Sequence, residues 1–98
     1  MNIQAMMKQA QKLQSDMMKA KEEIDNMDFE LTKSFVTIVA KGNKKVQSIH
    51  IDMDSIDKDD METVQDLILV TINELMDKID ATTESKMGKF SQGMPGLF

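Results

Sequence analysis

An unbroken repeat of apolar side chains runs through the first 27 residues, and it limits how this chain can fold more than any other feature. Apolar residues recur at alternating intervals of three and four positions, at Ile3, Met6, Ala10, Leu13, Met17, Ala20, Ile24 and Met27. This is the a/d pattern of a helix that packs along a narrow stripe against a neighbouring helix. The segment has no Gly or Pro and is rich in good helix formers. We therefore expect one long amphipathic helix over residues 1–27.

The residues after this helix change to a period of two, which indicates β-strands. Phe29 and Leu31 alternate with polar neighbours and predict a short first strand. The β-branched run in 34–41 predicts a second strand that is apolar on both faces and therefore central. Residues 41–44 (KGNK) have the composition of a hairpin turn, in which Gly and Asn tolerate positive φ. A third strand over 45–52 then completes an antiparallel meander.

A second long helix is expected from about Lys58 to about Lys86, after an acidic connector. Asp57 is its expected N-cap, and residues 67–72 are apolar almost all round, which predicts burial on two sides. From Gly88 onward, three Gly and one Pro interrupt the pattern. The predicted organisation is an α+β fold in a single domain, residues 1–87, in the order helix, three strands, helix. Residues 88–98 are expected to form a flexible tail.

The charge of the chain is unevenly distributed. The formal net charge is −5, but residues 1–50 contain eight Lys and six acidic residues, whereas residues 51–98 contain four Lys and eleven acidic residues. All twelve cationic residues are lysines, so the chain has no arginine fork for reading guanine edges. There is no cysteine, no apolar run of membrane-spanning length and no signal-peptide pattern at the start. We therefore expect a cytoplasmic protein whose DNA binding, if present, depends on phosphate contacts.

Three lysines of the first helix lie opposite the a/d stripe: Lys8, Lys12 and Lys19. They span eleven residues, or about 16 Å at the helical rise. This lysine row is long enough to follow several phosphates, although most helix lysines only face solvent. Lysines 41, 44 and 45 at the hairpin form a second possible phosphate contact, with the same alternative of a purely solubilising role.

Other chemistries find little support in the sequence. The acidic residues from Asp52 to Glu62 lack the glycine and the spacing of a calcium loop and are better explained by helix capping. His50 is the only histidine and has no cysteine or second histidine to work with. The glycines form no phosphate-binding loop, and the eleven methionines fit core positions better than a peptide groove. We expect no enzymatic activity, no cofactor, no metal, no membrane association and no small-molecule substrate.

Four short segments give the chain a family resemblance. They are 6–14 (MMKQAQKLQ), Val46 with Ile49, Ile51 and Asp52, residues 66–68 (DLI) with Asn73, and 93–98 (GMPGLF). In this order, and over essentially the whole chain, the sequence resembles the YbaB/EbfC family of bacterial nucleoid-associated proteins. One departure is the pair Lys33-Ser34, where many members of the family have Gly-Gly.

The resemblance implies a homodimer with projecting helical arms that binds duplex DNA in the bacterial cytoplasm, at the nucleoid. On this hypothesis Lys8, Lys12 and Lys19 contact DNA phosphates in chromosome organisation or transcription regulation. The alternative is a protein–protein adaptor, in which the a/d stripe and its methionines bind a helix of another protein. Net charge and the absence of arginine favour this second hypothesis.

Overall fold

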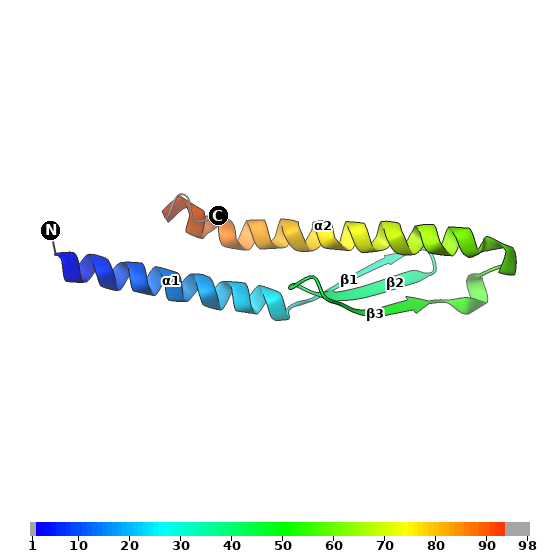
Figure 1. The fold of residues 1–98 in the computed structure, drawn as a ribbon, viewed down its shortest axis with the longest axis horizontal. Coiled ribbons are helices and arrows are strands. Elements are labelled where there is room, and N and C mark those ends of the chain that lie inside the picture. The colour runs from blue at the N-terminus through cyan, green and yellow to red at the C-terminus, as the bar shows by residue number, and fades with distance from the viewer. Residues whose placement is uncertain (1, 94–98) are drawn as a thin grey trace.

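The computed structural model describes residues 2–93, which form an elongated molecule of 72 × 19 × 13 Å (Figure 1). Along the chain, one long helix precedes a three-stranded sheet and a second long helix follows it. The elements are α1 (Ile3–Asn26), β1 (Asp28–Lys33), β2 (Val36–Lys41), β3 (Val46–Ile51) and α2 (Met61–Gly93). Two short 3-10 turns, η1 (Met53–Ser55) and η2 (Lys58–Asp60), connect β3 to α2. The predicted α+β class and the order of the elements are confirmed.

The sheet packs on the N-terminal half of α2. Its strands are antiparallel in the order β1-β2-β3, so β2 is central as predicted. The buried cluster between the sheet and α2 contains Phe29, Val36, Ile38, Ala40, Leu75 and Ile79. Only one face of β2 is fully buried, since Thr37 and Val39 on its other face remain half-buried. That other face of the sheet is therefore open to solvent in the single chain, and β3 is exposed except at Ile51.

The C-terminal part of α2 packs against α1 through a second, smaller cluster. Ile24, Met87 and Phe90 are buried there, and the partly buried Leu13, Met17, Ala20 and Met27 pack around them. The predicted a/d stripe of α1 thus does contact a helix. The contact covers only its C-terminal half, because Ile3 is 71% exposed and Met6 is 50% exposed. Residues 2–12, which we call the N-terminal arm, are exposed throughout and project beyond α2 (Figure 1).

Both ends of α2 differ from the sequence prediction. The helix begins at Met61, and the residues from Lys58 to Asp60 form the turn η2. Asp57 precedes this turn and its side chain accepts no capping hydrogen bond, so its predicted role as the N-cap of α2 is wrong. The helix continues past Lys86 and through Gly88 to Gly93, because burial of Met87 and Phe90 against Ile24 stabilises the helix there. Residues 94–98 of the predicted tail lie outside the described residues.

The predicted hairpin joins β2 to β3, but its glycine is needed for space and not for backbone conformation. The residue with positive φ is Lys44, at 69°. Gly42 is buried against the end of α1, where an added Cβ would lie 1.8 Å from the carbonyl oxygen of Ile24. Its backbone N–H also donates to the carbonyl oxygen of Met27, at 3.0 Å. The hairpin tip is therefore fixed to the C-terminal end of α1 at backbone level.

The first turn of α1 is capped by Asn2, whose side-chain oxygen accepts from the backbone N–H groups of Gln4 (3.0 Å) and Ala5 (3.3 Å). We expect Asn2→Ala to destabilise this turn by about 1 kcal/mol, because two amide donors lose their acceptor. Backbone Cα chemical shifts of the arm should move toward unfolded values, whereas Asn2→Ser, which keeps a capping oxygen, should preserve them. Unchanged shifts in Asn2→Ala would contradict this role of Asn2.

Candidate nucleic-acid interface

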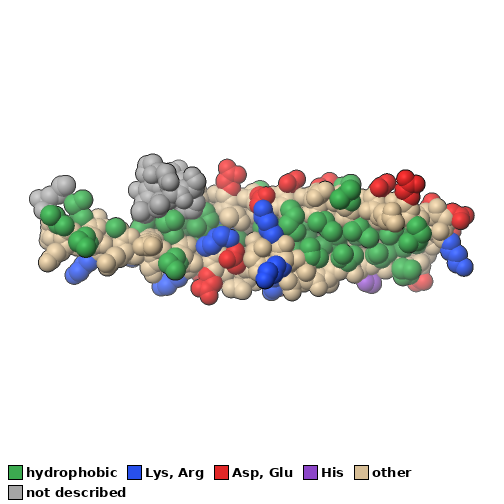
Figure 2. Space-filling model, viewed as in Figure 1, with side chains coloured by type: hydrophobic (Ala, Val, Ile, Leu, Met, Phe, Trp, Pro, Cys, Tyr) green, Lys and Arg blue, Asp and Glu red, His purple; other side chains and the backbone are tan. Residues whose placement is uncertain are grey.

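The lysine row occupies the face of α1 that points away from α2. Leu13 and Met17 fix the rotation of the helix by packing on the α1–α2 cluster, which turns Lys8, Lys12 and Lys19 outward. All three lysines are exposed, and within residues 2–93 none of them makes an ion pair. In Figure 2 lysine side chains lie along the edge of α1 that faces away from α2. The row therefore presents positive charge that needs no rearrangement before it meets an anion.

Four other lysines are already paired with carboxylates. The pairs are Lys21–Asp25, Lys33–Glu74, Lys41–Asp28 and Lys44–Asp80. The hairpin lysines 41 and 44 belong to this group, at 2.6 Å and 2.5 Å from their partners. Each must give up its carboxylate before binding a phosphate, so the hairpin is a weaker candidate than the lysine row. Lys45, the third hairpin lysine, is exposed and makes no ion pair with the described residues.

Exposed carboxylates lie on α2 and within the lysine row. In Figure 2 acidic side chains follow the edge of α2 farthest from α1 and the sheet, and the exposed acidic residues of α2 include Glu62, Asp66, Asp77 and Glu84. Asp16 is the single carboxylate between Lys8 and Lys19 on α1. A polyanion is thus attracted to the outer face of α1 and repelled from the outer edge of α2.

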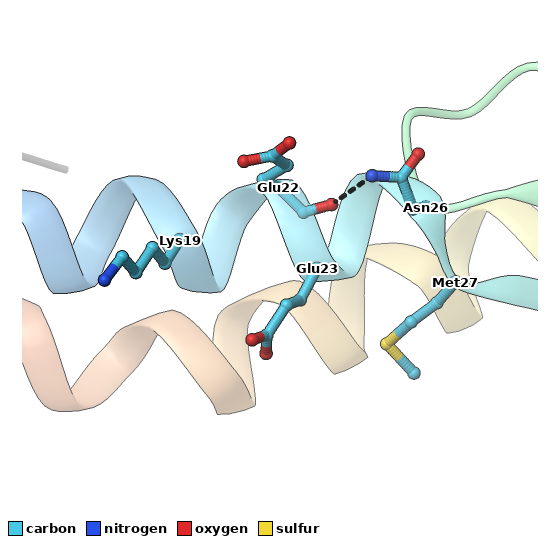
Figure 3. Close-up of a pocket in the computed structure, with 5 residues that line it drawn as sticks. All are labelled: Lys19, Glu22, Glu23, Asn26 and Met27. Carbon is cyan, nitrogen blue, oxygen red and sulfur yellow. Dashed lines mark hydrogen bonds between the residues drawn. The ribbon is translucent and has the colours of Figure 1, made fainter.

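A shallow hollow beside Lys19 marks the C-terminal end of the lysine row (Figure 3). It is lined by Lys19, Glu22, Glu23, Asn26 and Met27, and the Asn26 side-chain amide donates to the carbonyl oxygen of Glu22 at 3.0 Å. The ammonium group of Lys19 points toward the start of α1, away from both carboxylates. Because Glu22 and Glu23 repel phosphate, the usable interface extends from Lys19 toward the N-terminus.

Asp52 and His50, considered in the sequence for metal binding and catalysis, have structural positions that do not form such a site. The Asp52 side chain accepts from the backbone N–H of Asp54 (3.2 Å) and the hydroxyl of Ser55 (3.1 Å), and so caps the turn η1. His50 lies exposed on β3.

Across residues 2–93, no group of three or more His, Cys, Asp or Glu side chains is arranged to hold a metal ion. The same residues include no helix long and apolar enough to cross a membrane.

The two ion pairs that join the sheet region to α2 could not be found from the sequence. Lys44 and Asp80 are far apart in the chain and meet only because the hairpin tip and α2 lie side by side in the fold. Lys33 at the end of β1 and Glu74 on α2 are also far apart in the chain and meet only in the folded protein. Lys8, Lys12 and Lys19, by contrast, follow directly from the helical period, since the a/d stripe decides which face of α1 is free.

A small α+β body with a projecting helix, whose three exposed lysines make no ion pair among the described residues, presents a basic surface of the kind that binds a polyanion. The chain belongs to the YbaB/EbfC DNA-binding family, whose sequence profile matches residues 1–94. It is 42% identical over 97 residues to a nucleoid-associated protein of Lactococcus lactis subsp. cremoris, covering 97% of this chain and 98% of that protein. Identity is 43% over 99 residues to one from Ligilactobacillus salivarius (99% and 95% covered), and 38% over 98 residues to one from Enterococcus faecalis (98% and 94% covered).

These relationships confirm the resemblance seen in the sequence. The family and its members are named for DNA binding and nucleoid association and not for an enzymatic reaction, in agreement with the prediction of a protein that is not an enzyme.

Proposed function

We propose that this protein binds duplex DNA at the bacterial nucleoid through Lys8, Lys12 and Lys19, which contact backbone phosphates. The observation that carries the proposal is that these three lysines are exposed on one face of a projecting helix and unpaired among the described residues, whereas four other lysines are paired. Membership of the YbaB/EbfC DNA-binding family supports duplex DNA as the ligand. Such a protein would act in the cytoplasm, in chromosome organisation or transcription regulation.

The contacts available to this surface favour recognition of DNA shape over base sequence. The chain has no arginine, and lysine binds phosphate as a point charge without the bidentate geometry used on guanine. Phosphate contacts set register and orientation but carry no base information. Any sequence preference would then come from groove width and deformability.

The proposal includes a homodimer. A single chain leaves Ile49, which lies on the same face of the sheet as Ile38, 47% exposed and Leu69 on α2 60% exposed, together with Val46 and Val70. Apolar side chains at this density on a small domain favour association with a second copy. Two copies would present the lysine row twice and so double the number of phosphates that one assembly can neutralise.

A fluorescence anisotropy titration tests this function. A labelled duplex of about 30 base pairs is titrated with protein at several salt concentrations between about 50 and 200 mM. We expect binding that weakens steeply with salt, with a log–log slope of about −0.9 for each phosphate contacted. Absence of binding at the lowest salt, or an affinity independent of salt, would contradict the proposal.

A protein–protein adaptor is the second candidate, and the exposure of Ile3, Met6 and Met7 on the arm favours it. These residues could dock against an apolar helix of another protein. Affinity capture from lysate, with and without nuclease, separates the two functions. A protein partner retained after the DNA is digested supports the adaptor, whereas loss of all partners with the DNA supports the leading proposal.

A further inference from the structure

The exposed half of the a/d stripe on α1 lacks a partner within residues 2–93. From Leu13 to Met27 the stripe packs on α2, but Ile3 and Met6 are 71% and 50% exposed and Ala10 is also exposed. The a/d pattern is continuous across this boundary. The apolar stripe that packs on α2 at Leu13 therefore continues into the arm, where no described residue covers it. Large apolar side chains in such a row on a small protein indicate a contact surface.

The C-terminal end of α2 lies where this uncovered stretch begins. The two helices are antiparallel (Figure 1), and Phe90 belongs to the cluster against which Leu13 and Met17 pack. The helix α2 ends at Gly93, one turn after Phe90. The described part of α2 therefore ends beside the middle of α1, next to the arm.

The five residues after Gly93 have the composition and length to cover the arm. They are Met94, Pro95, Gly96, Leu97 and Phe98, of which three have large apolar side chains. Pro95 cannot continue a helix and disfavours helical backbone at the residue before it. Five extended residues span about 16 Å. The helical distance from Leu13 back to Ile3 is about 15 Å, which this segment can therefore follow.

We infer that residues 94–98 dock on the exposed a/d stripe of the same chain's arm, with Leu97 and Phe98 against Met6 and Ala10. A segment tethered at this position has a high effective concentration at the stripe, which favours it over a separate partner. The docked segment lies on the face opposite Lys8 and Lys12 and leaves both free. The inference is independent of the proposed DNA binding, since it concerns only the apolar face of the arm.

A single tryptophan tests the docking, because the chain contains neither Trp nor Tyr. In the full-length variant Phe98→Trp we expect an emission maximum shifted to the blue and acrylamide quenching several-fold weaker than in the same variant unfolded in urea. Both signals should be independent of protein concentration. Emission at the wavelength of free indole, or protection that vanishes on dilution, would overturn the inference; the second outcome would place the segment on another copy.

A matched pair of substitutions locates the docking site in the Phe98→Trp background. Met6→Gln removes an apolar side chain from the stripe and should shift the emission to the red and increase quenching. Met18→Gln makes the same chemical change at a residue of α1 that is 67% exposed and lies off the stripe, and it should leave both signals unchanged. Equal effects of the two variants, or none in either, would overturn the assignment of the docking site.

Methyl NMR of methionine gives a readout that needs no substitution in the docking site. Spectra of the natural chain are compared with those of a chain that stops after Gly93, both labelled at the methionine methyl groups. We expect the Met6 resonance to move and the Met53 resonance to stay, because Met53 is exposed in η1 at the opposite end of the molecule. An unmoved Met6 resonance would overturn the inference even if Phe98→Trp perturbed the fold.

Discussion

Replacing Lys8, Lys12 and Lys19 together with glutamine is expected to lower the affinity for duplex DNA on the order of a thousandfold at about 50 mM salt for each lysine row that contacts the duplex. Each lysine removed from a phosphate abolishes the release of one counterion, which at this salt concentration contributes roughly a factor of ten. The salt dependence should become shallower by about 0.9 for each phosphate that is no longer neutralised, and binding should weaken alike on all sequences. Anisotropy titrations of the parent and the variant over the same salt series give both quantities.

A control with the same net charge separates local binding from the overall field of the protein. Lys21, Lys33 and Lys58 replaced by glutamine also make the chain three charges more negative than −5, but these lysines lie outside the row. Two of them form exposed ion pairs, which contribute about 0–1 kcal/mol each to stability, so the control should fold. If the two triple variants bound DNA equally well, the assignment of the interface to α1 would be wrong.

Gly42→Ala should destabilise the protein by about 3 kcal/mol or more. The new Cβ would lie 1.8 Å from the carbonyl oxygen of Ile24 and 2.6 Å from its carbon, and both belong to backbone that no side-chain rotation can move. Relief requires the hairpin tip to separate from α1, which would break the hydrogen bond from Gly42 to Met27 and expose Ile24. Urea unfolding should show this as a large drop in the midpoint.

The same substitution at Gly88 is the natural control. Gly88 lies inside α2, and a Cβ added there meets nothing within 4 Å. We expect Gly88→Ala to stabilise the protein by about 0.5–1 kcal/mol, because alanine loses less backbone entropy in a helix. Changes of opposite sign in the free energy of unfolding for the two Gly→Ala variants would show that the loss of stability at position 42 comes from steric overlap and not from the amino acid type. An unfolding midpoint of Gly42→Ala equal to that of the parent would refute this account.

The elements with a strong local period could be predicted from the sequence, and those decided by distant contacts could not. The a/d stripe predicted α1, and the run Val36–Ala40 predicted the central strand, because periodicity reports which side of an element is buried. The sequence pattern predicts an end of α2 near Lys86, too early, because Gly88 interrupts the apolar pattern and the packing of Phe90 with Ile24 that extends the helix is not visible in the local sequence.

The pair Lys33-Ser34, where the sequence departs from the family resemblance, includes a strained residue. Ser34 adopts φ of 54° in the turn between β1 and β2, a region that favours glycine. The resemblance marks this pair as a departure, but only the structure shows that Ser34 adopts the left-handed conformation. The lysine row could be predicted because it depends on helical period alone, whereas its distinction from the paired hairpin lysines depends on the tertiary fold.

The two separate hydrophobic clusters on α2 imply two different free energies of opening. The cluster with the sheet contains six buried residues, whereas the cluster with α1 contains only Ile24, Met87 and Phe90 among the described residues. Local unfolding generally begins where the fewest apolar side chains are buried. The α1–α2 pair therefore forms the less stable cooperative unit, and it can separate while the sheet remains folded on α2. Amide protons of the strands would then exchange only through global unfolding, and in the proposed complex with DNA this separation would let α1 change its angle to follow a curved duplex.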